Sequence, residues 1–533
     1  MSAELVSLVE EHVRRRAPLE RSAREADWNL ARTADKRWEE EAARLSSETR
    51  RLLSDRSVFA RLSAIRSAAR PTDPDLDRQL ELLWLDHAAN QADPALLAEL
   101  AGLEARAEAT YSSFRPELDG TPVSENAIRE ILRDSDDAAL RRRAWEASKA
   151  LGPVTAPLVL EMVRRRNRIA EGVGSRDFFA MDLGRQEIEE PFLFDVLGRL
   201  EKLTAEPHER LLERLFAQLS RRFGIRPTDV RPWHLADPFF QEAIAPEGLD
   251  LGRFYAGVDL AELAKEAFAR MGFDVRNILA RSDLYPRESK NQHAFCTHVD
   301  RTTDDVRVLC NLQSDDYWAD TILHEVGHAV YDESLDPALP WRLREESHIL
   351  TTEAMALLCG RLATNPDWMI RVLGAKAEEV NAIRAKLREN SRTRQLLFPR
   401  WVLVMTHFER ALYGGGESDL GRHWWDLVER FQKVKRPEGR AEPDWACKMH
   451  VALAPVYYHN YLLGDLMASQ LDAWLTRELG TPFWFERKET AALLRSRLFV
   501  EGARRPWNET LRHATGESLD PAHYVEQFVR EHS

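Results

Sequence analysis

The chain has 533 residues, of which 44% are hydrophobic and 31% are charged, enough apolar material for a large core beneath a charged surface. Its formal net charge of −13 disfavours nucleic acid and anionic membranes as partners, because phosphate groups demand clustered Lys and Arg. No stretch of the sequence approaches the ~18 apolar residues of a membrane span, so we expect no membrane partner.

The amino-terminal segment carries acids where a secretory signal peptide would have a positive start and an apolar core. The four cysteines are irregularly spaced, at Cys296, Cys310, Cys359 and Cys447. They form neither a disulfide framework nor a Cys-ligated zinc site, which suits a reducing compartment. The sequence therefore predicts a cytoplasmic protein.

Helical periodicity dominates the first third of the chain. Apolar residues recur at three- and four-residue intervals, which predicts helices through 45–62, 80–87, 96–114, 127–150 and 157–172. Breaks rich in Pro or Gly at 71–74, 227–238, 337–340 and 414–416 separate helices rather than domains. We therefore expect a mainly α fold forming one domain over residues 1–533.

The segments 291–299 and 306–312 read as two short strands on either side of a turn at 300–305. This pattern predicts a small β-hairpin. Its exposed edge could pair with an extended peptide and form one wall of a cleft, or the hairpin could only pack against the helix that follows. A disulfide between Cys296 and Cys310 is a further alternative.

The segment 319–331 contains an H-E-x-x-H motif formed by His324, Glu325 and His328. Residues four apart share one helical face, so both imidazoles can reach one zinc ion while the glutamate projects toward water at the open position. Apolar neighbours favour a buried helix. The alternative is an amphipathic helix with two surface histidines.

A catalytic zinc ion needs a third protein ligand. Tyr331 and Ser334 occupy the places of the Gly and His of the extended metzincin pattern, which excludes that class. A second helix is expected over 344–362, and within it Glu353 lies among apolar residues, where a lone carboxylate needs a cation partner. The other candidates, Glu345, Glu346 and His348, fall in the first turn, where acidic residues favour the helix dipole and face water. Alternatively, Glu353 pairs with Arg361.

Imidazoles and tyrosines gather again near the carboxyl end, at His450, Tyr458 and Tyr461. A helix starting near Pro455 would present both tyrosine hydroxyls on one side. Such donors suit a developing oxyanion, although residues of this kind are also ordinary at the edge of a core.

These three clusters, in this order, resemble the angiotensin-converting enzyme family of zinc peptidyl-dipeptidases and, more distantly, thimet oligopeptidase and oligoendopeptidase F. In all of them a glutamate on the next helix is the third zinc ligand. Further segments look like family landmarks, so the resemblance covers most of the chain: 26–29, 106–114, 145–146 and 423–425.

The resemblance implies roles for individual residues. His324, His328 and Glu353 would bind one Zn²⁺, and Glu325 would be the general base. His450 and Tyr461 would stabilise the tetrahedral intermediate. Substrate contacts are implied for His293, the backbone of Ala294, Lys448, Tyr458 and Gln241, the last three holding a free carboxylate.

The sequence also departs from the family pattern. Val428 and Asn460 stand where converting enzymes carry arginines, so we do not expect chloride activation. Leu357 replaces an aspartate one turn after the glutamate ligand, so another residue, such as Asp332, would have to support the metal ligands. Gln292 occupies one place of the family's disulfide near the hairpin.

The resemblance implies a large helical, two-lobed peptidase with a deep central cleft, with residues 1–110 as a lid that admits short peptides. The expected activity is release of dipeptides from a carboxyl terminus. Three alternatives remain: an endo-acting oligopeptidase, a catalytically silent peptide-binding protein that keeps zinc, and a helical scaffold without metal.

Overall fold

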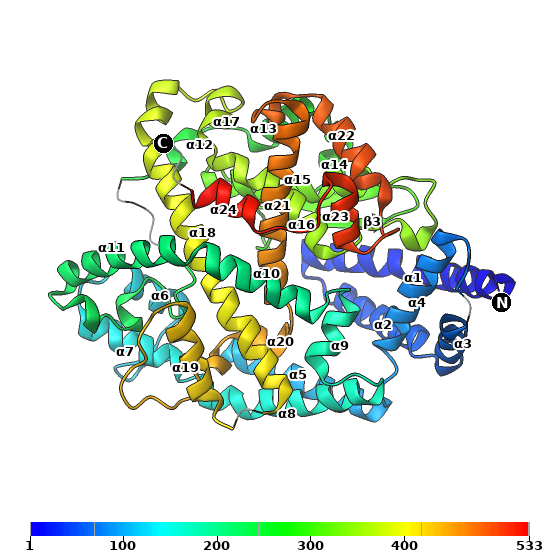
Figure 1. Cartoon of the computed structure of the whole chain (residues 1–533), viewed down its shortest axis with the longest axis horizontal. Helices are drawn as coiled ribbons and strands as arrows, with labels where there is room; N and C mark the ends of the chain where they lie inside the picture. Colours follow the sequence, from blue (N-terminus) through cyan, green and yellow to red (C-terminus); the bar gives the residue numbers. More distant parts are fainter. Residues whose placement is uncertain (1, 69, 243–245, 247, 417, 531–533) are drawn as a thin grey trace. The chain divides into compact units, whose positions relative to one another are not determined.

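The computed structural model describes residues 2–68, 70–242, 246, 248–416 and 418–530. Nearly all regular structure is helical, and the described strands form two small antiparallel pairs (Figure 1). The chain divides into two compact units, each assembled from three segments. The first comprises Met1–Gln91, Gly248–Leu387 and Leu463–His523, and the second comprises Ala92–Glu247, Arg388–Leu462 and Tyr524–Ser533. The predicted mainly α fold is confirmed.

The first unit contains the H-E-x-x-H segment. Its elements are α1 (Ser2–Thr33), α2 (Lys36–Leu53), α3 (Arg56–Ser67), α4 (Pro74–Ala88), α12 (Gly252–Tyr255), α13 (Leu260–Met271), α14 (Arg276–Arg281), β3 (Phe295–Asp300), β4 (Asp305–Leu309), α15 (Asp316–Glu333), α16 (Ile349–Gly360), α17 (Pro366–Arg371), α22 (Glu489–Arg497) and α23 (Trp507–Thr515).

The second unit contains the histidine and tyrosine cluster. Its elements are α5 (Pro94–Ser113), β1 (Glu117–Leu118), β2 (Thr121–Pro122), α6 (Glu125–Asp134), α7 (Ala138–Lys149), α8 (Gly152–Gly172), α9 (Phe178–Arg185), α10 (Glu190–Leu203), α11 (Ala205–Phe223), α19 (Leu420–Phe431) and α20 (Met449–Leu453). Three helices carry residues of both units: α18 (Ala377–Gly414), α21 (Tyr458–Leu479) and α24 (Ala522–Phe528).

Two of the predicted helices are wrong in extent because polar side chains cap the chain inside them. The run 45–62 is split between α2 and α3, where Asp55 accepts hydrogen bonds from the backbone N–H groups of Ser57 and Val58. The run 127–150 is split between α6 and α7 in the same way, with Asp137 as the cap. A side-chain acceptor that satisfies the first N–H groups begins a new helix, whereas hydrophobic periodicity continues across the break.

Helix α15 of the first unit carries the H-E-x-x-H motif. It packs along α16 and also against the hairpin β3–β4 (Figure 1). Asp315 caps it by accepting from the N–H of Trp318. The predicted hairpin beside the motif helix is therefore confirmed, with strands shorter than expected.

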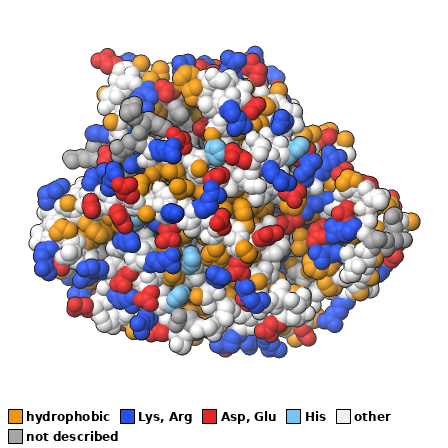
Figure 2. All heavy atoms as spheres, in the orientation of Figure 1, with side chains coloured by type: hydrophobic (Ala, Val, Ile, Leu, Met, Phe, Trp, Pro, Cys, Tyr) orange, Lys and Arg blue, Asp and Glu red, His pale blue; other side chains and the backbone are white. Residues whose placement is uncertain are grey.

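Acidic and basic side chains are interspersed on the face of the molecule drawn in Figure 2. Among the described residues many oppositely charged side chains form i,i+4 pairs, for example Arg142 with Glu146 at 2.8 Å, and such pairs contribute little individually. Among the described residues, no helix has both the length and the apolar composition needed to cross a bilayer. The single peptidase domain, its lid at 1–110, its two lobes and its central cleft stay predictions.

Candidate metal centre

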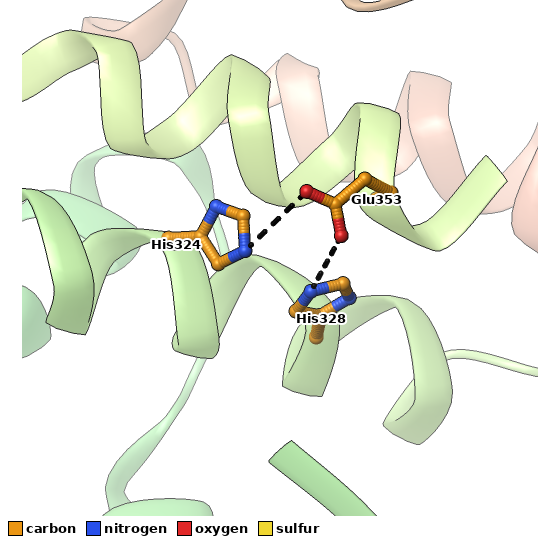
Figure 3. Close-up of side chains that lie close together, drawn as sticks. All are labelled: His324, His328 and Glu353. Carbon is orange, nitrogen blue, oxygen red and sulfur yellow. Dashed lines mark ion pairs between the residues drawn. The ribbon is translucent and has the colours of Figure 1, made fainter. Parts of the chain in front are cut away.

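Two helices of the first unit bring the predicted ligands together. His324 and His328 lie one turn apart on α15, and Glu353 faces them from α16 (Figure 3). His324 Nε2 lies 3.7 Å from Glu353 Oε1, and His328 Nε2 lies 3.6 Å from Glu353 Oε2. One ligand atom from each of the three residues falls within 4.8 Å of the others.

These separations are too long for hydrogen bonds but fit a metal site. Two ligands each ~2.0–2.1 Å from a tetrahedral ion stand roughly 3.4 Å apart. Burial lowers the pKa of His324 to about 4, which keeps the imidazole neutral. Burial would raise the pKa of Glu353, but His328 and His324 outweigh it and the pKa falls below its usual range. Burial would lower the pKa of His328, but Glu353 outweighs it and the pKa lies above its usual range, so a metal would take the place of a proton on that ring. Neutral imidazoles and an ionised carboxylate are the forms that bind metal, and two His with one Glu are a donor set that zinc accepts.

Two of the rival ligands, Glu345 and His348, and the rival partner of Glu353 make other contacts. Arg361 pairs with Asp465, with Nη2 and Oδ1 2.5 Å apart, so it does not neutralise Glu353. Glu345 pairs with Arg301 at 2.8 Å, and His348 caps α16 by accepting from the N–H of Leu350.

This capping also corrects the predicted second helix. It begins at Ile349 rather than Arg344, because the His348 side chain satisfies a backbone donor at that point. Glu345 and Glu346 consequently precede the helix and are half-buried, instead of facing water in its first turn.

The side chain that supports His328 is Thr352. Its Oγ1 lies 2.8 Å from His328 Nδ1, the ring nitrogen opposite the one that faces Glu353. When Nδ1 carries the proton and donates it to Thr352, Nε2 is left with its lone pair for a metal. Sequence analysis gave Asp332 as one residue that could take this role and did not single out Thr352, because no local feature of the sequence distinguishes that side chain.

Glu325 lies on the same helix and is 8% exposed. Burial raises its pKa to about 7, with the Glu353 charge adding to the rise, while His328 and the backbone N–H of Cys296 act against it. A carboxyl group with a pKa near neutrality can both take up and release a proton at physiological pH.

The hairpin presents one unpaired edge toward this region. Val308 of β4 donates its N–H to Ser282 Oγ and accepts from the N–H of Asp283, so Val308 faces away from β3. Its cross-strand partner Cys296 must turn its own N–H and C=O to the outer edge of β3. The influence of the Cys296 N–H on Glu325 agrees with this direction.

Ala294 precedes Cys296 by two residues and lies just before the first residue of β3. His293, next to it, is exposed. Cys296 and Cys310 are both free thiols, as are Cys359 and Cys447, so the alternative disulfide across the hairpin is not formed.

The second unit brings together the three residues that the resemblance assigns to a free carboxylate. Gln241 Oε1 accepts from Lys448 Nζ at 3.1 Å and from the Tyr458 hydroxyl at 3.3 Å. Burial lowers the pKa of Lys448 to about 8, and its Nζ lies 5.4 Å from the centre of the Phe239 ring.

Asp237, which sequence analysis did not single out, shapes this loop. Its buried carboxylate accepts from the N–H groups of Phe239, Gln241 and Glu242 at 2.8, 3.0 and 2.9 Å. The Asp-Pro pair at 237–238 was the sequence signal for such a turn.

His450 and Tyr461 also belong to the second unit, and both lie beside Tyr458. The ring centres of His450 and Tyr458 are 4.8 Å apart, and those of Tyr458 and Tyr461 are 5.5 Å apart. Burial lowers the pKa of His450 to about 4, and Lys448 adds to the effect. The helix that carries the tyrosines begins at Tyr458, not near Pro455.

Comparison with known proteins gives a distant similarity. No model of a protein family matches the sequence. The angiotensin-converting enzyme-like protein Ace3 of Mus musculus is 24% identical over 521 residues, an alignment that spans 87% of this chain and 68% of that protein. The extent of this alignment supports a distant relation to angiotensin-converting enzyme-like proteins.

Proposed function

We propose that the protein is a zinc-dependent peptidase that hydrolyses short peptides. The observation that carries the proposal is the buried carboxyl group of Glu325. It follows His324 directly in the sequence, and His324, His328 and Glu353 have the spacing of metal ligands. A site that holds zinc only for structure closes its fourth position with protein and has no use for a base. The catalytically silent alternative is therefore disfavoured.

The chain's own residues supply the proton transfers in this proposal. Zinc, when bound by His324, His328 and Glu353, polarises a carbonyl group and makes water more acidic. Glu325 accepts the proton of the attacking water and returns it to the leaving amine, which its raised pKa allows at neutral pH. The outer edge of β3 at Cys296 and Ala294 would hydrogen-bond the backbone of an extended peptide.

We further propose release of carboxyl-terminal dipeptides. The Lys448 ammonium group, the Tyr458 hydroxyl and the Gln241 amide, which already contact one another, would hold the free carboxylate of the substrate. His450 and Tyr461 would donate hydrogen bonds to the oxyanion. These roles rest on the resemblance and on the clustering of the five side chains around Tyr458.

The general-base role is tested with Glu325→Gln. This variant keeps the three ligands and the size of the side chain but cannot accept the proton. We expect full zinc content by metal analysis and a loss of turnover of at least about 10²-fold. His324→Ala serves as the contrast, because it should lose zinc as well as activity. Substantial turnover by Glu325→Gln would contradict the role.

The carboxylate role is tested with one unmodified peptide and its amidated twin. Mass spectrometry of wild-type products should show stepwise loss of dipeptides from the free carboxyl end. Lys448→Ala should raise KM about tenfold or more for the unmodified peptide and change KM for the amidated one little. Internal cuts and equal effects on both peptides would favour the endo-acting oligopeptidase.

A further inference from the structure

The backbone is strained at Val456, six residues after His450 and two before Tyr458. Its φ is +52°, in the left-handed region that a β-branched residue avoids. The side chain is fully buried, so the strain does not arise in a loose surface loop. Such a conformation persists only where the surroundings over-determine it, and it is found preferentially at functional sites.

Two buried side chains from distant segments hold both backbone groups of Val456. The Val456 N–H donates to Oε1 of Glu409, on α18, at 2.8 Å. The Val456 carbonyl accepts from Nε2 of Gln186, just after α9, at 3.0 Å. Glu409 is 2% exposed and Gln186 8% exposed, so water does not compete for these bonds.

Gln186 also binds the chain on the other side of Tyr458. Its Oε1 accepts from Asn460 Nδ2 at 2.7 Å and lies 3.1 Å from His459 Nε2. Its Nε2 additionally donates to Asp182 at 2.6 Å, which determines the orientation of the amide. The Gln186 side chain thus contacts residues on both sides of Tyr458, at positions 456, 459 and 460.

Asn460 stands where the resembled family carries an arginine. Here the Asn460 side-chain amide donates a hydrogen bond to Gln186. This uncharged contact is therefore one of those by which Gln186 holds the 456–460 segment.

We propose that Glu409 and Gln186 are positioning residues that hold the strained turn at Val456 and thereby orient Tyr458 and Tyr461. The inference deepens the proposed function and rests on it. Its physical basis is that Tyr458 is the first residue of α21, so the direction of its side chain follows the backbone immediately before it. Its hydroxyl contact to Gln241 and its ring contact to His450 both depend on that direction.

The test compares Glu409→Leu with Glu409→Gln. Leucine leaves the Val456 N–H unpaired, whereas the glutamine carbonyl can still accept from it. Thr204→Val is the control, because Thr204 is a buried residue of the same unit whose hydroxyl binds Arg400 at 2.7 Å and not the 456–460 segment. Hydrogen exchange is measured over 454–462, and kinetics are measured on a free and an amidated peptide.

We expect Glu409→Leu to speed exchange in 454–462 about tenfold or more and to retain wild-type zinc content. It should lower kcat on both peptides and raise KM only for the one with a free carboxylate. Glu409→Gln should restore these quantities to within about twofold of wild type, and Thr204→Val should leave them unchanged. Gln186→Leu should reproduce the effect of Glu409→Leu. If Glu409→Leu does not fold, the result with Gln186→Leu tests the inference in its place.

Normal exchange and normal kinetics in Glu409→Leu or Gln186→Leu would overturn the inference. So would an equal effect of Thr204→Val, since it would indicate loss of general stability alone. An inactive wild-type protein would overturn the proposed function instead. If the wild-type protein is inactive, hydrogen exchange alone tests the positioning role. Unaltered exchange in the two leucine variants would refute that role, and faster exchange confined to 454–462 would support the claim that Glu409 and Gln186 hold the turn at Val456.

Discussion

Among single residues, Thr352 has a specific influence on the candidate metal centre. Its hydroxyl lies 2.8 Å from His328 Nδ1, and partners of this kind fix both the tautomer and the orientation of a metal-binding imidazole. The adjacent Thr351 is also buried, but its hydroxyl binds the carbonyl of His348 at 2.7 Å. The two threonines therefore separate an effect on the metal from an effect on the helix.

We predict that Thr352→Val weakens zinc binding by about 10–100-fold, measured by competition with a chelator of known affinity. Valine keeps the shape of the side chain and removes the acceptor for the His328 N–H. Thr351→Val is expected to lower stability without a comparable change in zinc affinity, and Thr352→Ser to bind zinc nearly as wild type does. Equal affinities for wild type and Thr352→Val would contradict the role.

The three residues of the candidate metal centre could be selected from the sequence because each had a chemical reason visible there. His324 and His328 had helical spacing, and Glu353 was a carboxylate in an apolar run. Thr352 and Glu409 could not be predicted in the same way. Their roles depend on contacts with residues 24 and 47 positions away, and nothing local distinguishes such a side chain from an ordinary core residue.

At the scale of elements, the centre depends on the close approach of α15 and α16. Gly327, inside the H-E-x-x-H motif, faces the backbone of α16: a Cβ at this position would lie 2.8 Å from the Cα of Ala356 and 3.1 Å from the carbonyl oxygen of Met355. Backbone atoms cannot move aside as a flexible side chain would. Any larger residue must therefore push apart the two helices that carry the ligands.

We accordingly predict that Gly327→Ala lowers the free energy of unfolding by about 1–3 kcal/mol and weakens zinc binding. Urea unfolding and chelator competition measure the two effects. Gly198→Ala is the matched control, since Gly198 lies inside α10 with nothing within 4 Å of its missing Cβ. There alanine should stabilise the helix by about 0.5–1 kcal/mol. A stable, zinc-binding Gly327→Ala protein would show that the helices can separate without consequence.

Helix boundaries were the least predictable feature at this scale. The breaks at Asp55, Asp137 and His348 all come from side chains that accept from backbone N–H groups of the following turn. Asp is a common helix cap but is also frequent inside charged helices, so the residue type alone does not mark a break. Only the tertiary position of the two flanking helices decides which of these acids is used.

For the whole molecule, periodicity and composition were sufficient to predict a mainly α protein, because long amphipathic runs admit few other structures. The division into two units, each made of three separated segments, could not be predicted. The breaks at 71–74 and 337–340 lie within the first unit, and the change of unit at position 387–388 falls inside the continuous helix α18. The composition of the sequence therefore does not change at the positions where the chain passes from one unit to the other.

The pH dependence of global stability should carry a contribution from Glu409. Burial raises its pKa from 4.5 to about 8, and Asp182 acts in the same direction, while the Val456 N–H and Arg166 act against the rise. Between these pH values the folded protein retains a proton that the unfolded chain has released. The associated stabilisation is complete below pH ~4.5 and is lost as the pH rises toward ~8, with a slope of at most about 1.4 kcal/mol per pH unit.

Glu409→Gln removes this contribution, because the glutamine side chain stays neutral at every pH while its carbonyl can still accept from Val456. We predict that the difference in unfolding free energy between Glu409→Gln and wild type shifts in favour of the variant from pH 5 to pH 8. Urea unfolding at intervals of half a pH unit would measure it. Glu161→Gln is the control, since Glu161 lies at the surface and pairs with Arg164 and Arg165, and its difference from wild type should not rise over this range. If the difference in unfolding free energy between Glu409→Gln and wild type stays constant with pH, Glu409 ionises normally inside the fold. The acceptor for the Val456 N–H would then be an ionised carboxylate.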